Sequence, residues 1–251
     1  MLATALFLSQ RYLDESQRLS AAGDAQGAMK ASQLAARLDP FDTEALETQS
    51  FILEQQQRYE DAAKSLREAI DRDPHNYTLY LMLGNLQLNE LDDLGAAEKS
   101  YRKVLELNPK ETDVREALAQ TLIEEGELGE ARDEYEKLKE QNKISYQGLY
   151  DLGRIYVRTG RPQEGLQDIK RAQKRAEAEL DELKEPLKFQ QQKLIESMQL
   201  AIADALVVQG RYAQAREILA QSSSPQAPAL LQLLNSDPEA YRESVVTSAI
   251  Y

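Results

Sequence analysis

The chain contains no cysteine and no tryptophan, and it has a single histidine. Without cysteine, its 251 residues can form no disulfide bond and no thiolate metal site. His75 directly follows Pro74, and no nucleophile and base are arranged around it in the sequence. The glycines are isolated from one another, so there is no glycine-rich phosphate loop. The usual sequence signs of catalysis are therefore missing.

Positive charge is also scarce. Thirty lysines and arginines stand against 43 aspartates and glutamates, which gives a formal net charge of -13. Binding to a phosphate backbone needs clustered lysines and arginines, so we expect no nucleic-acid partner. The acidic cluster Glu124-Glu125-Glu127-Glu130 lacks the ligand spacing and the central glycine of a calcium loop, which favours a solvated helix face. We expect no metal, no cofactor and no enzyme activity.

Long hydrophobic runs are missing as well. The apolar start of the chain ends at Leu8, and a membrane-spanning helix needs about 20 apolar residues. This start also lacks the basic region that opens a secretory signal. The segment Ala5-Leu6-Phe7-Leu8 therefore predicts a hydrophobic cap on the first helix. The alternative is that it is the end of a membrane helix in a longer parent protein.

Good helix formers dominate what is present: alanine, leucine, glutamate, glutamine and lysine. Three proline phrases end amphipathic stretches, because the residue before a proline is driven out of the α region. They are Leu38-Asp39-Pro40, Arg72-Asp73-Pro74 and Leu107-Asn108-Pro109. The prolines lie 34 and 35 residues apart, a period typical of stacked helical hairpins. The sequence predicts an all-α protein.

Between these phrases, a helix breaker precedes a small residue at a fixed offset. A glycine at a helix end supplies a left-handed turn, and the small residue lets the second helix approach the first closely. The pairs are Gly23 and Ala28, Gln57 and Ala62, Asp92 and Ala97, Gly126 and Ala131, Gly160 and Gly165, and Gly210 and Ala215. Six helical hairpins are therefore expected.

These positions make the sequence similar to the tetratricopeptide repeat family. In the third hairpin, Tyr80, Leu83-Gly84, Ala97, Tyr101 and Pro109 match the large, Leu-Gly, small, aromatic and proline positions of that family. The resemblance implies a right-handed superhelical solenoid over 1–221. Its repeats would lie near 9–42, 43–76, 77–111, 112–145, 146–195 and 196–221.

The repeat frame breaks in two places. The sixth hairpin begins about 50 residues after the fifth, and the intervening charged stretch contains Pro186. We expect two extended helices that meet near Glu185-Pro186 and project beyond the stack; the alternative is one long helix broken at the proline. Residues 222–251 are expected to form a linker and C-terminal capping helices. An exposed partner-binding helix is the alternative there.

In this family the first helix of each hairpin lines the concave groove. The resemblance implies that the groove residues are Gln17, Phe51, Asn85, Gln120, Tyr150 and Arg154, with Asp204 continuing the ladder. Asn85 and Gln120 would bind main-chain amides, Phe51 and Tyr150 would act as apolar anchors, and Arg154 would receive a carboxylate. The alternative is that they are ordinary solvated residues.

The resemblance implies a non-catalytic scaffold that binds a peptide or helix of another protein. Family members that clamp the acidic C-termini of chaperones carry a set of lysines, asparagines and an arginine. Only Asn85 and Arg154 resemble members of that set here, which disfavours this partner. The alternative function is the assembly or regulatory portion of a membrane-envelope machine, such as a polysaccharide polymerase or ligase. We expect a cytoplasmic location, with membrane association or the periplasm as alternatives.

Overall fold

The computed structural model describes residues 2–250, so Met1 of the expected apolar cap lies outside the described residues. Within them every regular element is a helix, which confirms the predicted all-α class. No helix among these residues is long and apolar enough to cross a membrane. The helices are α1 (Leu2–Ala21), α2 (Ala25–Leu38), α3 (Glu44–Gln55), α4 (Tyr59–Arg72), α5 (Tyr77–Asn89), α6 (Leu94–Leu107), α7 (Thr112–Glu124), α8 (Leu128–Glu140), α9 (Tyr146–Arg158), α10 (Pro162–Leu180), α11 (Leu187–Val208), α12 (Tyr212–Gln221), α13 (Ala227–Ser236) and α14 (Pro238–Thr247).

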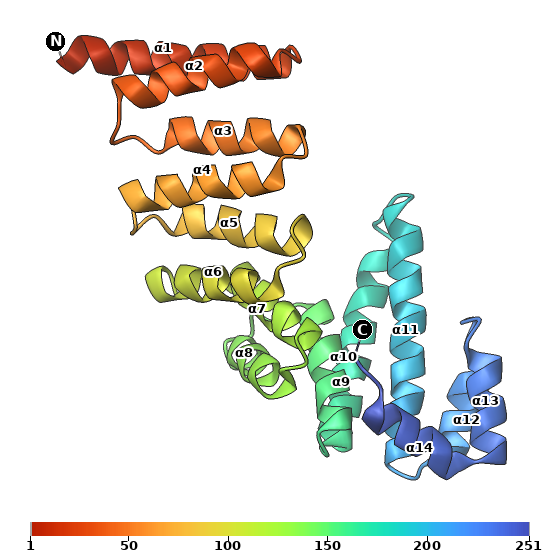
Figure 1. Cartoon of the computed structure of the whole chain (residues 1–251). Helices are drawn as coiled ribbons and strands as arrows, with labels where there is room; N and C mark the ends of the chain where they lie inside the picture. Colours follow the sequence, from red (N-terminus) through yellow and green to blue (C-terminus); the bar gives the residue numbers. More distant parts are fainter. Residues whose placement is uncertain (1, 251) are drawn as a thin grey trace. The chain divides into compact units, whose positions relative to one another are not determined.

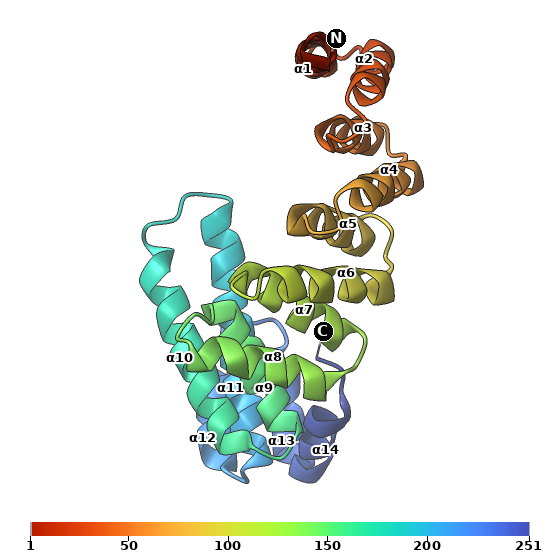
Figure 2. The ribbon, with the colours of Figure 1, turned by 90° about the vertical axis from the view of Figure 1, so that its left-hand side faces the viewer.

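The helices form two compact units that divide between Thr121 and Leu122, and each unit is described by itself. In the first unit, α1 packs on α2, α3 on α4 and α5 on α6, and each hairpin packs on the next (Figure 1). Figure 2 shows that α1, α3 and α5 form one layer, with α2 and α4 in the other. We call the exposed side of α1, α3 and α5 the first-helix face.

The turn inside each hairpin uses a left-handed residue, as the breaker pattern predicts. Gly23, Gly126, Gly160 and Gly210 have φ angles between +73° and +86°. The second and third hairpins place Gln57 (φ +58°) and Asp92 (φ +51°) at the corresponding position. The fixed offset therefore matters more than glycine itself, because the turn needs one positive φ and a side chain can be tolerated there at some cost.

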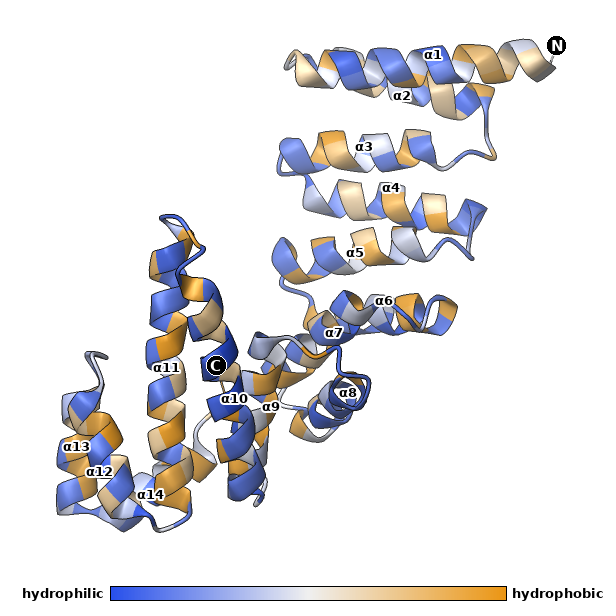
Figure 3. Cartoon of the chain, turned by 180° about the vertical axis from the view of Figure 1, so that it is seen from behind, coloured by the Kyte–Doolittle hydropathy of each residue, from blue (hydrophilic) through white to orange (hydrophobic). Residues whose placement is uncertain are grey.

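Small residues sit where two helices of a hairpin cross. Ala28, Ala62, Ala97, Ala131 and Ala215 are fully buried. In the fifth hairpin, a Cβ added to Gly165 would lie 2.5 Å from the carbonyl oxygen of Gly153, so only glycine fits. The predicted close crossings are confirmed. Along each helix, hydrophobic residues alternate with hydrophilic ones, as the hydropathy colours in Figure 3 show.

The second unit contains the long helices. α10 has 19 residues and α11 has 22, and they meet at residues 181–186, which include a cis Glu185–Pro186 peptide bond. α13 packs on α12, and α14 returns to pack on α11 and α9. Asp237 caps α14 by accepting a hydrogen bond from the Ala240 backbone N–H, and Pro238 opens the helix. The predicted boundary between a solenoid over 1–221 and a linker with capping helices over 222–251 stays a prediction.

Candidate protein-binding site

Two of the six predicted groove residues lie in one cavity of the first unit. The cavity has a volume of about 630 Å³ and opens between α1 and α3 near their C-terminal ends. Phe51 keeps 53% of its surface exposed there, although large apolar side chains are usually covered. Apart from Ile52, the remaining lining is small or carries amide or hydroxyl groups, and none of it is charged. It consists of Gln17, Ser20, Ala21, Gly23, Ala25, Thr48, Ile52, Gln55 and Gln56.

Asn85 and Gln120 lie outside this lining but are exposed on α5 and α7. The side-chain oxygen of Asn85 accepts a hydrogen bond from the Tyr101 hydroxyl at 2.9 Å. This bond holds the amide and leaves its NH₂ group for other acceptors. Burial raises the pKa of Tyr101 to about 12, so the phenol remains a donor at physiological pH. The predicted role of Asn85 in binding main-chain amides stays a prediction.

Tyr150 and Arg154 belong to the second unit, and their surroundings differ from the expectation. Tyr150 is only 7% exposed, so the expectation of an exposed apolar anchor is wrong. The Arg154 guanidinium lies 5.1 Å from the centre of the Tyr150 ring, and its Nη1 is 3.6 Å from Oδ1 of Asp151. Arg154 is thus already engaged with an aromatic ring and a carboxylate.

The C-terminal segment packs on the helix that carries Tyr150 and Arg154. α14 packs against α9 and α11, the two first helices of the fifth and sixth hairpins (Figure 1). The Tyr241 hydroxyl donates to Oδ1 of Asp204 at 2.8 Å. Arg158 donates from Nε to the carbonyl oxygen of Ser248 at 3.1 Å and from Nη2 to that of Ala249 at 3.5 Å. The chain's own C-terminal segment therefore occupies the face that carries the expected groove residues of the second unit.

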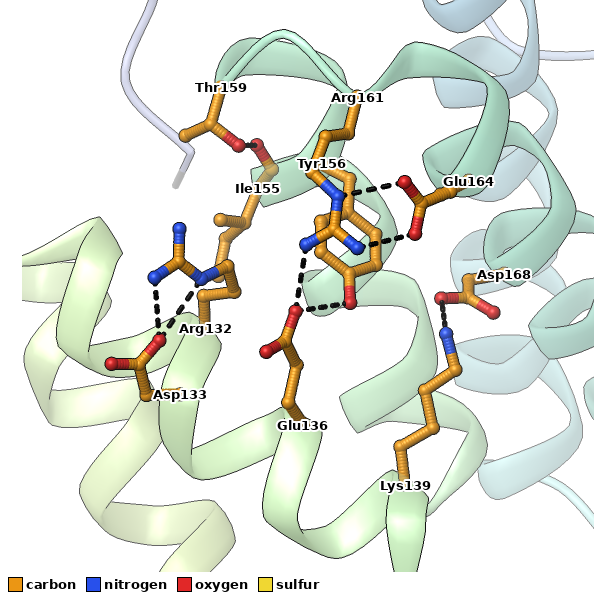
Figure 4. Close-up of polar contacts among 10 residues, drawn as sticks. All are labelled: Arg132, Asp133, Glu136, Lys139, Ile155, Tyr156, Thr159, Arg161, Glu164 and Asp168. Atoms are coloured by element: carbon orange, nitrogen blue, oxygen red, sulfur yellow. Dashed lines mark hydrogen bonds and ion pairs between the residues drawn. The ribbon is translucent and has the colours of Figure 1, made fainter.

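A polar cluster joins α8 to α9 and α10 (Figure 4). The Tyr156 hydroxyl donates to Oε1 of Glu136 at 2.6 Å, and Arg161 donates to the same oxygen at 2.9 Å. The Arg161 guanidinium also lies 4.2 Å from the centre of the Tyr156 ring and pairs with Glu164. Burial and the bond to Glu136 raise the pKa of Tyr156. These groups satisfy one another, so the cluster fastens the fourth hairpin to the fifth.

Metal-ligating side chains are not gathered in the part of the chain that the structure describes. No group of three or more histidines, aspartates or glutamates in that range is placed to hold a metal ion. His75 is exposed in the turn after α4, where its backbone N–H donates to Asp73. What the geometry offers instead is a cavity with an apolar anchor and amide groups, which suits the binding of a peptide.

The comparisons with known proteins agree with this fold. Two tetratricopeptide repeat family models match residues 52–112 and 88–149. Residues 52–149 of the chain therefore contain tetratricopeptide repeats. The comparison with curated protein sequences gives no match.

Several solved structures have a similar fold, and two of those described here are tetratricopeptide repeat proteins. One from Parabacteroides merdae ATCC 43184 matches 97% of this chain and 93% of its own, with a TM-score of 0.59 at 16% identity. The MamA protein matches 68% of this chain and 93% of its own, with a TM-score of 0.58 at 22% identity. YrrB, described as a repeat protein with an unusual peptide-binding site, matches 64% and 82%, with a TM-score of 0.54 at 22% identity.

Sequence reasoning missed Tyr241 and Arg158. Arg158 follows Arg154 by one helical turn, so both side chains project from the same side of α9. Tyr241 is a large aromatic residue four positions before Val245, and both are buried on α14. That i, i+4 apolar pair was the available signal that α14 packs against another element.

Proposed function

We propose that this tetratricopeptide repeat protein is a non-catalytic scaffold that holds a segment of a partner protein on the first-helix face of its first unit. The observation that carries the proposal is the exposed ring of Phe51 in the cavity between α1 and α3, beside the Gln17 amide. An apolar side chain of the partner would cover Phe51, and amides would bind its backbone. We propose a cytoplasmic location.

Two further observations support this proposal. The lining of the cavity comes from successive first helices, which is where the family resemblance places a groove. YrrB shares the fold and is described as having a peptide-binding site. In the second unit the corresponding face is occupied by α14, so the first unit is the better candidate for binding in trans. Asn85 and Gln120 extend the proposed site along the same ladder.

Site-specific photo-crosslinking tests the proposal. A photoreactive phenylalanine analogue at position 51 in the native host is expected to crosslink to one or a few defined proteins. The matched control is the same analogue at position 41, because Phe41 is 87% exposed in the turn before α3 and does not line the cavity. Crosslinks that are identical from both positions, or that survive Gln17→Trp in the cavity, would contradict the assignment.

A second candidate function is the assembly or regulatory part of a membrane-envelope machine. It is favoured by Leu6 and Phe7 on α1, which are 43% and 62% exposed and form an apolar patch that another segment could cover. Sequencing the codons upstream of Met1 tests it. A hydrophobic coding continuation supports this function, and a stop codon in frame contradicts it.

A further inference from the structure

Charge is distributed unevenly between the two layers of the first unit. The helices of the first-helix face, α1, α3 and α5, carry five acidic side chains and two basic ones. The helices behind them, α2, α4 and α6, carry eight basic side chains and six acidic ones. The face that bears the cavity is therefore the acidic one, while the opposite layer has a small excess of positive charge.

The acidic side chains beside the cavity are close together and are not neutralised. We call Asp14, Asp42, Glu44 and Glu47 the acidic rim. Partial burial and the neighbouring charges of Asp42, Glu47 and Asp14 raise the pKa of Glu44. Among the ion pairs of residues 2–250, none joins a member of the acidic rim to a base. Their side-chain hydrogen-bond donors are instead neutral groups: the Gln10 amide donates to Asp14, and the Thr43 hydroxyl donates to Glu47.

Helix capping accounts for only part of this arrangement. Glu44 and Glu47 lie in the first turn of α3, where the helix dipole favours carboxylates. Asp14, however, lies in the middle of α1, far from the positive end of that helix. Arg72 donates to the backbone carbonyl of Asp42, but its guanidinium forms its ion pair with Glu68. Helix capping and the ion pairs of the described residues therefore do not account for the negative charge at Asp14.

The acidic rim begins one helical turn from the cavity on both helices. On α1, Asp14 precedes Gln17 by three residues, and on α3, Glu47 precedes Phe51 by four. At 1.5 Å per residue these offsets correspond to about 5 to 6 Å along each helix. Glu44 lies a further turn away, roughly 10 Å from Phe51 along α3. A bound segment that places an apolar side chain against Phe51 would thus present its next turn to carboxylates.

From this geometry we propose that the partner segment is basic and amphipathic, with an apolar residue that enters the cavity and lysine or arginine side chains that meet the acidic rim. This inference rests on the proposed function and adds the chemistry of the partner. Charge complementarity supplies the argument, because an acidic or neutral segment would leave the crowded carboxylates uncompensated or repelled. The disfavoured acidic chaperone tail is the opposite of this chemistry.

Peptide selection against the purified full chain tests the proposal. The probe is a display library of random 14-residue peptides, selected in about 50 mM salt because rim charges are screened at higher ionic strength. We expect the enriched peptides to carry a net positive charge together with one or more large apolar residues. Their affinity should fall on the order of tenfold for the double variant Glu44→Lys and Glu47→Lys, since each exposed pair contributes modestly and each reversal adds repulsion.

A charge reversal of the same size elsewhere provides the control. Glu60→Lys with Asp61→Lys alters two exposed acids in the first turn of α4, in the other layer, and should change the affinity less than twofold. Phe51→Ala should lower the affinity of the same peptides on the order of tenfold or more. Circular dichroism of each variant establishes that the helices are retained.

The outcomes separate this inference from the proposed function. Enriched peptides that depend on Phe51 but are neutral or acidic would overturn the basic chemistry and leave the binding site in place. Peptides that bind regardless of both Phe51 and the acidic rim would overturn the site and the inference together. A selection that enriches no peptide above the blank support would overturn the proposed function itself. Basic peptides that respond equally to the control reversal would show nonspecific attraction and contradict the inference.

Discussion

The hydroxyl of Tyr241 lies 2.8 Å from Oδ1 of Asp204 and donates a hydrogen bond that joins α14 to α11. The tyrosine side chain is buried, and the carboxylate is partly withdrawn from water. A buried acceptor that loses its donor pays its desolvation cost without compensation. This contact therefore helps to hold α14 against α11, together with the bonds from Arg158 to Ser248 and Ala249.

Replacement of Tyr241 by phenylalanine should destabilise the second unit by about 1.5–3 kcal/mol, because a hydrogen bond to a charged group is lost while the ring is kept. Urea denaturation followed by circular dichroism measures the change. Tyr212→Phe is the matched control, since Tyr212 donates to Glu239 in an exposed position and its loss should cost less than about 0.5 kcal/mol. Equal effects of the two variants would show that the buried contact is not special.

The same contact shows where prediction from sequence ends. The choice of equivalent repeat positions found Gln17 and Phe51, because a 34-residue period fixes which side chains of neighbouring first helices share a face. It also placed Asp204 on that ladder, but it could not foresee that Tyr241 covers it. The return of α14 depends on the path of residues 222–237, which follow no repeat, and on a contact between residues 37 positions apart. Local periodicity carries no information about such a contact.

The pKa of Asp204 gives a pH-dependent prediction. Burial raises this pKa above its ordinary value, and the Tyr241 bond and the charges of Arg158 and Arg154 only partly oppose the shift. The folded protein therefore holds the proton more tightly than the unfolded chain does. The corresponding stability is present below the unfolded pKa of about 3.9 and is lost as the pH rises through the folded pKa.

Asp204→Asn removes this titration while keeping an oxygen that can accept from Tyr241. The free energy of unfolding of the variant, minus that of the original protein, should increase as the pH rises above about 4 and then level off. Denaturant titrations at several pH values between 3 and 8 measure the difference. A difference that stays constant over that range, or that decreases, would show that the folded environment does not raise the pKa of Asp204.

The crossing of α9 and α10 predicts a cost for the smallest possible substitution. A Cβ on Gly153 would lie 2.6 Å from Cγ1 of Ile169 and 2.9 Å from the carbonyl oxygen of Gly165. The backbone cannot move away cheaply, so Gly153→Ala should lower the free energy of unfolding by about 1–3 kcal/mol despite the better helix propensity of alanine. Differential scanning calorimetry would record a lower Tm.

Gly129 supplies the control for that substitution. It lies in the first turn of α8, and nothing would be within 4 Å of a Cβ added there. Gly129→Ala should therefore raise stability by up to about 1 kcal/mol through helix propensity alone. If Gly153→Ala raised the free energy of unfolding by the same amount, this result would contradict the close crossing of α9 and α10 at Gly153.

The turn between α3 and α4 predicts a stabilising change. Gln57 adopts φ +58° at the position where four of the six hairpins have glycine. A residue with an L side chain has a higher conformational energy in this left-handed region, whereas glycine adopts it without that cost. Glycine also raises the backbone entropy of the unfolded chain, which opposes part of the gain. The net effect of Gln57→Gly should be an increase in the free energy of unfolding of roughly 0.5–1 kcal/mol.

The control is Gln33→Gly, at an exposed position inside α2. It should lower the free energy of unfolding by about 1 kcal/mol, because glycine replaces a better helix former in an ordinary helical backbone. Urea titrations of the two variants are expected to shift in opposite directions, and shifts in the same direction would show that the left-handed residue at 57 is not what shapes the hairpin turn.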